Sequence, residues 1–386
     1  MGLKDRDYPS VSPSGFLDEF MRLRRGSVSR RHFLQASGLG LATAVLSAGV
    51  APKISLAAKP DRGSTVSLAT WPNYHAPAVL EAFIEATGIV VDLEVFGSNE
   101  EMYARLRTGR AKWDLLIPTN YTISDYVARG LIEVLDQSRL PNLQIARQNP
   151  RLTAPGIIES QIYALPRNWG TTGIAFNTRS LSSTPQNWKQ FFELAMTEAS
   201  GHTIVHNYQL TTIGNALVAL GYSFNSVVPD ELAEVEKLLL DLKPHLLAID
   251  SDYQAAVRAG DATLAMCWSN DASQLHRDLP YIHYRLGTDG GEIWTDFYAI
   301  PKNAPNKPAG YALLNFLLDP AIAAKELGSS GAGATDSRVL DLLPRELVEN
   351  RISYPDDNSL NVLEFGAAVT LTDPNRREIM ERFRSA

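Results

Sequence analysis

The sequence has very little cysteine, and it lacks internal repeats and the short motifs that mark common catalytic sites. Its 386 residues include one cysteine, Cys267, so an internal disulfide is excluded. We find no nucleophile elbow, no phosphate-binding glycine loop and no zinc signature. The glycine-rich residues 328–333 follow an expected helix, which is the wrong context for a dinucleotide-binding turn. We therefore expect no cofactor and do not expect an enzyme.

Two histidines could suggest a metal site, but their context argues against one. His202 and His206 are four residues apart, which suits two ligands on one helix. Residues 203–205 between them are Thr-Ile-Val, which favours a strand. Side chains four positions apart on a strand stand about 13 Å from each other. Since no cluster of cysteines and acids accompanies the pair, we predict no metal site.

The first 58 residues have the pattern of a removable export signal. Residues 29–34, SRRHFL, place an arginine pair before a hydrophobic dipeptide, and residues 38–50 form a Gly- and Ala-rich run too short for a comfortable membrane span. Residues 55–58, SLAA, supply the small side chains that a signal peptidase reads. The segment resembles a twin-arginine export signal, so we predict a periplasmic protein exported by that route. A basic N-terminal helix that stays on the protein is the alternative.

The charge of the chain is unevenly distributed. The whole chain carries −7, whereas residues 1–58 hold eight Lys or Arg and four Asp or Glu, a net of +4, so the remainder carries −7 − 4 = −11. An acidic protein is a poor candidate for binding nucleic acid or an anionic membrane. A cationic small molecule would suit it better, and we expect no nucleic-acid partner.

The hydrophobic pattern after residue 58 predicts alternating strands and helices. Strands are expected at residues 64–70, 90–96 and 114–117, with helices between them at 77–87 and 98–109. This β-α-β-α-β order is typical of a parallel sheet covered by helices. Ligands bind beyond the carboxyl ends of such strands, so the loops at 71–74 and 119–121 should open on one crevice.

The middle of the chain predicts a second lobe. Strand patterns at residues 161–166 and 170–177 lead out of the first lobe, and residues 297–301 should lead back, so that two connecting strands form a hinge. We predict an α/β protein with two lobes, each a mostly parallel sheet flanked by helices. The expected divisions are the export signal (1–58), the first lobe (59–172), the second lobe (173–295), and the rest of the first lobe with C-terminal helices (296–386).

The most suggestive stretch is GEIWTDFYAIP, residues 291–301. Trp294 and Asp296 are two residues apart, so they lie on the same side of an extended segment. An aromatic face beside a carboxylate can receive an organic ammonium ion through cation–π attraction and a charge-assisted hydrogen bond. A core tryptophan beside a strand-end aspartate would give the same pattern, so the pair alone leaves both interpretations open.

Four blocks of sequence, in this order and spacing, resemble the periplasmic spermidine/putrescine-binding proteins of ABC importers. They are TWPNY at 70–74, FGSNEEMYARL at 96–106, DLLIPTNY at 114–121, and Trp268 paired with WTDFYAIP at 294–301. The similarity covers nearly the whole chain after the leader. It implies a periplasmic-binding-protein-like fold of two lobes that closes on its ligand and delivers it to the permease subunits of an ABC transporter. We expect a monomer.

The resemblance also implies the residues that bind the ligand, because members of the family hold amine groups between aromatic rings and acidic side chains. Carried over position by position, one wall would contain Trp71, Tyr74, Thr119 and Tyr121, and the other Trp268 and Trp294 with Asp271 and Asp296 as counter-ions. Asp271 matches a position that is acidic in the putrescine-binding branch. The expected ligand is therefore putrescine or a related polyamine.

The sequence departs from the family at three places. Residues 206–211, HNYQLT, contain no acid where the family commonly has one or two. Asn73 stands where an acid is frequent, and residues 332–335 replace a ligand loop that contains Tyr and Pro. A buried ammonium ion without a partner is costly, so a ligand with one or two cationic centres is favoured over a long polyamine.

Two alternatives remain, one suggested by these departures and one by the export signal. The same fold could bind another amine-containing solute, such as an amino-acid derivative, an opine or a quaternary amine, with His206, Tyr208 and Gln209 bonding its tail. An exported enzyme is the other alternative, because twin-arginine export often serves folded cofactor proteins. Turnover of a candidate amine would support the enzyme, whereas stoichiometric binding without product would exclude it.

Overall fold

The computed structural model describes residues 64–72 and 74–385, and all of them fall within one compact unit of the chain. The expected export signal (1–58) and Asn73 lie outside the described residues. Strands and helices alternate along the described chain, which confirms the α/β class. None of the described helices combines the length and the apolar character needed to cross a membrane.

A mixed sheet of 11 strands organises these residues, with the main path β2-β1-β3-β11-β6-β9-β7-β8. The strands of this path are β1 (Thr65–Thr70), β2 (Val90–Val95), β3 (Leu115–Leu116), β6 (Ala164–Asn177), β7 (Thr203–Val205), β8 (Leu246–Ile249), β9 (Leu264–Trp268) and β11 (Glu292–Ala299). Attached to the path are β10 (Ile282–Arg285) and β12 (Gly333–Ala334) on β6, and β13 (Glu364–Phe365) on β11. A separate hairpin consists of β4 (Ile157–Ile158) and β5 (Gln161–Ile162).

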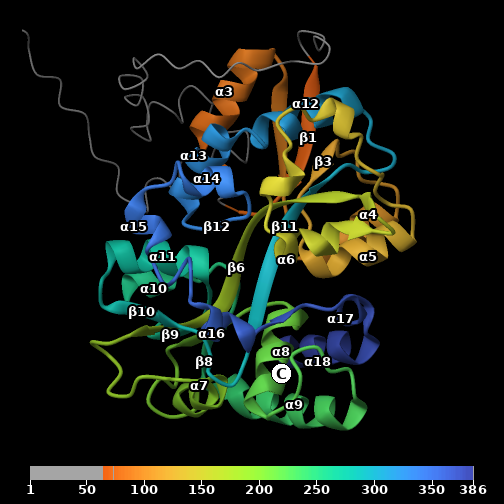
Figure 1. The fold of residues 1–386 in the computed structure, drawn as a ribbon. Helices are drawn as coiled ribbons and strands as arrows, with labels where there is room; N and C mark the ends of the chain where they lie inside the picture. Colours follow the sequence, from red (N-terminus) through yellow and green to blue (C-terminus); the bar gives the residue numbers. More distant parts are fainter. Residues whose placement is uncertain (1–63, 73, 386) are drawn as a thin grey trace, which may run out of the picture. The chain divides into compact units, whose positions relative to one another are not determined.

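Two groups of parallel strands are joined by an antiparallel pair. β2, β1 and β3 are parallel to one another, and so are β9, β7 and β8. β6 and β11 run antiparallel and side by side between the two groups (Figure 1), and every residue of both strands is buried. This matches the expected pair of mostly parallel sheets connected by two strands. The lobe boundaries at 172/173 and 295/296 stay a prediction.

Helices flank the sheet and begin and end where local sequence signals place them. Ser98 accepts a hydrogen bond from the N–H of Glu101 at the start of α4, and Gly88, with φ +75°, ends α3. The helices are α3 (Pro77–Thr87), α4 (Asn99–Arg107), α5 (Asn120–Ala128), α6 (Pro150–Thr153), α7 (Trp188–Ala195), α8 (Gln209–Ala219), α9 (Pro229–Leu242), α10 (Gln254–Ala259), α11 (Ser269–Asp278), α12 (Lys307–Leu317), α13 (Pro320–Ser330), α14 (Ser337–Leu340), α15 (Arg345–Val348), α16 (Asp357–Asn361), α17 (Ala368–Thr372) and α18 (Pro374–Ser385).

The expected break between two strands near residue 167 is wrong, because β6 is one strand of 14 residues. Phe297 pairs with Pro166 and Asp296 with Asn168, which leaves Arg167 as an extra residue opposite β11. Such a β-bulge accommodates a proline that has no N–H to give to the ladder. Tertiary pairing therefore overrides the local signal that a proline gives.

Two segments expected as loops are instead the first turns of helices. Asn120 and Tyr121 begin α5, and Asp271 lies in the first turn of α11. The preceding residues, Thr119 and Trp268, have extended backbone, so each helix starts directly after its strand. The expected polar exit from β9 is therefore corrected to a helix start.

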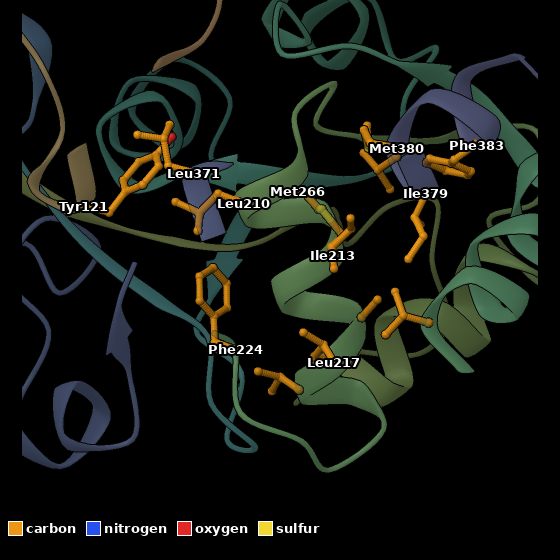
Figure 2. Packing of buried hydrophobic residues seen from close by; sticks show 14 of the residues in the cluster. Tyr121, Leu210, Ile213, Leu217, Phe224, Met266, Leu371, Ile379, Met380 and Phe383 are labelled. Atoms are coloured by element: carbon orange, nitrogen blue, oxygen red, sulfur yellow. The ribbon is translucent and has the colours of Figure 1, made fainter. Parts of the chain in front are cut away.

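A large hydrophobic cluster surrounds α8. Figure 2 shows Leu210, Ile213 and Leu217 of α8 in this cluster, together with Met266 of β9 and with Ile379, Met380 and Phe383 of α18. The C-terminal helix α18 thus packs on α8 and joins it to the core. This packing fixes α8 against β9, whose last residue is Trp268.

Candidate functional site

The candidate site lies along one face of β11. Glu292, Trp294 and Asp296 occupy alternate positions and share this face, as the sequence predicts for the last two. Their side chains are buried, with exposed fractions of 2%, 6% and 5%. Their neighbours across the ladder are Thr172, Gly170 and Asn168 on β6, and Trp268 on β9 opposes Thr172.

Asp296 is the point where three separate segments meet. The hydroxyl of Tyr74, after β1, donates to Asp296 Oδ2, and the hydroxyl of Thr119, after β3, donates to Oδ1 at 2.6 Å. Thr119 is itself held by the amide of Asn99, whose Nδ2 donates to its hydroxyl at 2.9 Å. The two loops expected to open on one crevice therefore converge on the predicted counter-ion.

The Asp296 carboxylate has hydrogen-bond donors but forms no ion pair with any residue that the structure describes. Burial raises its pKa to about 6, although the bonds from Thr119 and Tyr74 and the charge of Arg167 act in the opposite direction. The group is thus ionised at neutral pH and desolvated. This is the electrostatic setting in which a carboxylate attracts an external cation.

The ring of Trp294 lies against Gly170 of β6, which has no side chain. A Cβ on Gly170 would stand 2.7 Å from Cη2 of Trp294 and 2.6 Å from the hydroxyl of Ser269. Among the described residues, the buried indole N–H of Trp294 has no hydrogen-bond partner, and neither has that of Trp71, which packs against the hydrophobic core. Gly170 therefore permits the position of the Trp294 ring.

We expect Gly170→Ala to lower the free energy of unfolding by about 1 to 3 kcal/mol, because the new methyl group overpacks this contact. Chemical denaturation measures the loss, and tryptophan fluorescence should report a changed environment for Trp294. Gly97→Ala is the matched control, since a Cβ there meets nothing within 4 Å. Equal stability of the two variants would contradict the close contact.

Trp268, the last residue of β9, belongs to an aromatic cluster with His206 and Tyr208, which follow β7. Its ring centroid lies 4.6 Å from that of His206, and its indole N–H donates to the hydroxyl of Tyr208 at 3.3 Å. His206 is also stacked on Tyr208, with centroids 5.6 Å apart. Burial lowers the pKa of His206 to about 3, so the imidazole is neutral at physiological pH.

Asp271 is held by a different set of groups from Asp296. The hydroxyl of Tyr253 donates to its Oδ2 at 2.8 Å and accepts from the backbone N–H of Trp268 at 2.9 Å. Burial raises the pKa of Asp271 to about 6. Within the described ranges the two predicted counter-ions share no hydrogen-bond donor, since Tyr74 and Thr119 donate to Asp296.

Tyr121 and Gln209 are buried in the protein. Tyr121 lies in the core cluster beside Leu210 and Leu371 (Figure 2), and its hydroxyl has no partner among the described groups. Gln209 donates to the carbonyl oxygen of Thr370 at 2.9 Å. Groups of three or more metal-ligating side chains do not occur in residues 64–72 and 74–385, and His202 bonds the carbonyl oxygen of Asp261.

A buried charge network lies behind Tyr74, and sequence reasoning missed it. The guanidinium of Arg167 donates to Glu326 at 2.7 Å and to the carbonyl oxygen of Tyr74 at 2.5 Å. Its charge centre also lies 4.2 Å from the centroid of the Tyr74 ring. Glu326 further contacts His75 at 2.9 Å and accepts from the N–H of Ala76. The network therefore fixes residues 74–76, which carry a donor to Asp296.

Glu292 is the second residue that sequence reasoning missed. Thr172 donates to its carboxyl group at 2.5 Å. Burial raises the pKa of Glu292 to about 8, the bond from Thr172 opposes this shift, and the charge of Asp296 adds to it. The signal was available in the sequence, since Glu292 precedes Trp294 by the same two positions by which Asp296 follows it.

The raised pKa of Glu292 predicts a stability that falls with pH. In the ligand-free protein its contribution is fully present below the ordinary pKa of 4.5 and is lost as pH rises through about 8. The whole effect is at most about 5 kcal/mol. Glu292→Gln should therefore melt at a higher temperature than the wild type above pH 8, and melting curves between pH 5 and 9 check this. Parallel curves for the two proteins would contradict it.

Comparisons with known proteins agree with this architecture. A family model described as bacterial extracellular solute-binding protein matches residues 78–337. The spermidine/putrescine-binding periplasmic protein of Escherichia coli is 29% identical over 332 residues, which cover 86% of this chain and 91% of that protein. A putrescine/agmatine-binding protein of Pseudomonas aeruginosa is 26% identical over 317 residues, covering 78% and 86%.

A solved structure of a solute-binding protein has a similar fold. The spermidine/putrescine ABC transporter substrate-binding protein of Streptococcus pneumoniae, in complex with calcium and HEPES, is similar with a TM-score of 0.67 and 27% identity. The match covers 83% of this chain and 99% of that one. The two-lobed fold class expected from the sequence is thereby confirmed.

Proposed function

Because the chain belongs to the bacterial extracellular solute-binding proteins, we propose that it captures a small cationic amine, putrescine or a related polyamine, and delivers it to the permease of an ABC importer. Relatives with these ligands in their names support the substrate class. The protein would act as a monomer in the periplasm after export by the twin-arginine route, and it would bind its ligand without converting it.

One observation carries this proposal: Asp296 is a buried carboxylate that accepts two hydroxyl donors and pairs with no cation among the described residues, beside the buried Trp294. An ammonium group would supply the missing charge, and the aromatic face would cover the adjacent methylene groups. Closure of the lobes would remove water and strengthen the attraction. Trp71, Trp268, Tyr121 and Asp271 stay predicted ligand contacts.

The second candidate is the same fold with a single-headed amine solute. It is favoured by residues 206–211, where no acid occurs and His206 is neutral and buried. A neutral wall at this end would accept an uncharged tail better than a second ammonium group. The two candidates differ in the number of cationic centres that the site neutralises.

Calorimetric titration tests the proposal on the full chain, freed of bound ligand by unfolding and refolding. The ligands are putrescine, spermidine, agmatine, γ-aminobutyrate and choline. Binding of a diamine at micromolar concentration or below is expected, with the ligand recovered unchanged. Binding of γ-aminobutyrate or choline alone would favour the second candidate, and silence for every amine would overturn the proposed function.

A further inference from the structure

We propose that Glu292 binds the second cationic centre of a diammonium ligand and thereby makes the site selective for diamines over monoamines. The inference rests on the proposed function, since it deepens the same site. Asp296 would neutralise one ammonium group and Glu292 the other. The sequence assigned this second role to Asp271, so the two residues can be tested against each other.

The first argument is the position of Glu292 on β11. Residues 292 to 296 pair without interruption with residues 172 to 168 of β6, and the bulge comes only after Asp296. Glu292, Trp294 and Asp296 therefore form a straight row on one face, with about 13 Å between the outer two Cα atoms. An extended diamine lying along this row would place its alkyl chain against Trp294 and an ammonium group near each carboxylate.

The second argument is that Glu292 is buried without a cation. Its exposed fraction is 2%, and in the described part of the chain its one donor is the neutral hydroxyl of Thr172. Glu326 shows the contrast, because this equally buried carboxylate is paired with Arg167 at 2.7 Å. A buried carboxylate needs either a proton or a cation, and the residues that the structure describes supply no cation for Glu292.

The groups that face Glu292 strengthen this argument. Three phenols interact electrostatically with it: Tyr121 on α5, Tyr208 before α8 and Tyr284 on β10. Burial raises the pKa of each phenol well above its ordinary value, and an ionised Glu292 would add to the shift, so all three are neutral at pH 7. Asp296 on its own strand is negative and raises the pKa of Glu292. The ligand-free protein therefore holds a proton on Glu292 at pH 7, and a dication would displace it.

A separate observation marks the face between the two carboxylates. Trp294 is only 6% exposed, and its buried indole N–H has no hydrogen-bond partner among the described residues. The ring lies between Glu292 and Asp296 on the shared face of β11. Anionic groups at both ends of an aromatic surface match the chemistry of a linear diammonium ion.

The experiment compares putrescine with n-butylamine, which has the same carbon chain and one charge. Calorimetry uses the ligand-free full chain at pH 8 and the variants Glu292→Gln, Glu292→Asp and Asp271→Asn. We expect Glu292→Gln to weaken putrescine by at least about 30-fold while butylamine changes by less than about 3-fold. Glu292→Asp should recover part of the putrescine affinity, and Asp271→Asn should keep the selectivity.

Proton release upon binding distinguishes a direct ligand contact of Glu292 from a purely structural role, because a structural residue would not lose its proton when the ligand binds. At pH 7 the wild type should release about one proton per putrescine, measured from the binding enthalpies in two buffers of different ionisation enthalpy, and Glu292→Gln should release almost none. Unchanged selectivity in Glu292→Gln, or its loss in Asp271→Asn instead, would overturn the inference alone. A wild type that binds neither amine would overturn the proposed function and the inference with it.

Discussion

Glu326→Ala is expected to lower the free energy of unfolding by about 3 to 5 kcal/mol, because it leaves a buried guanidinium without its anion. The side chains of Arg167 and Glu326 are both almost fully buried and lie 2.7 Å apart. Burial lowers the pKa of His75, so its imidazole is neutral at pH 7 and Arg167 carries the positive charge of the network. Arg167 cannot withdraw to solvent, because it is the extra residue of the bulge in the buried strand β6.

Urea denaturation of the ligand-free protein measures this loss. The matched control is Glu349→Ala, which breaks the pair of Arg345 and Glu349 at the same distance of 2.7 Å on exposed side chains. Exposed pairs one helical turn apart contribute about 0.3 to 0.5 kcal/mol, so the control should be nearly silent. A Glu326 variant as stable as the control would mean that water or another group replaces the carboxylate.

The same variant should also weaken amine binding. Glu326 neutralises the charge of Arg167, and without it the unpaired charge would act more strongly on Asp296, where Arg167 already opposes the rise in pKa that burial causes. An uncompensated positive charge near Asp296 would weaken the attraction of Asp296 for a cationic ligand. The network of Arg167 and Glu326 therefore affects both the stability of the fold and the negative charge of Asp296 that is available to bind the ligand.

The sequence predicted the parts of the fold that follow from local pattern. The order β1, α3, β2, α4 and β3 was correct, because each element carries its own periodicity and its own stop signal. Trp294 and Asp296 were placed correctly on one face, since a period of two depends only on extended backbone. These features need no knowledge of distant contacts.

Features that depend on distant contacts were not predictable. The bulge at Arg167 exists because β6 pairs with β11, and the partner of Arg167, Glu326, lies 159 positions along the chain. Pro166 gave the opposite local signal. Glu292 is a different case, because its position was readable but its burial was not. An exposed glutamate with the same spacing would carry no functional meaning.

Asp296→Asn is expected to weaken amine binding by about 2 to 5 kcal/mol, because it removes a desolvated charge that the ligand neutralises. Folding should be little affected, since the asparagine oxygen still accepts one of the two hydroxyl donors. The matched control is Asp289→Asn, seven positions earlier, which removes the same charge from an exposed aspartate that accepts the backbone N–H of Trp188 at 3.0 Å. Calorimetry and melting curves on both variants separate binding from folding.

The pH dependence of the wild type then tells how Asp296 acts. Its pKa is raised to about 6, so the ionised form that binds a cation is lost as pH falls through that value. A monoamine, which needs only this carboxylate, should bind about tenfold more weakly for each pH unit below 6, and Asp296→Asn should be flat over the same range. If the variant instead binds within about 3-fold of wild type with the same pH profile, Asp296 serves only to join Tyr74 and Thr119.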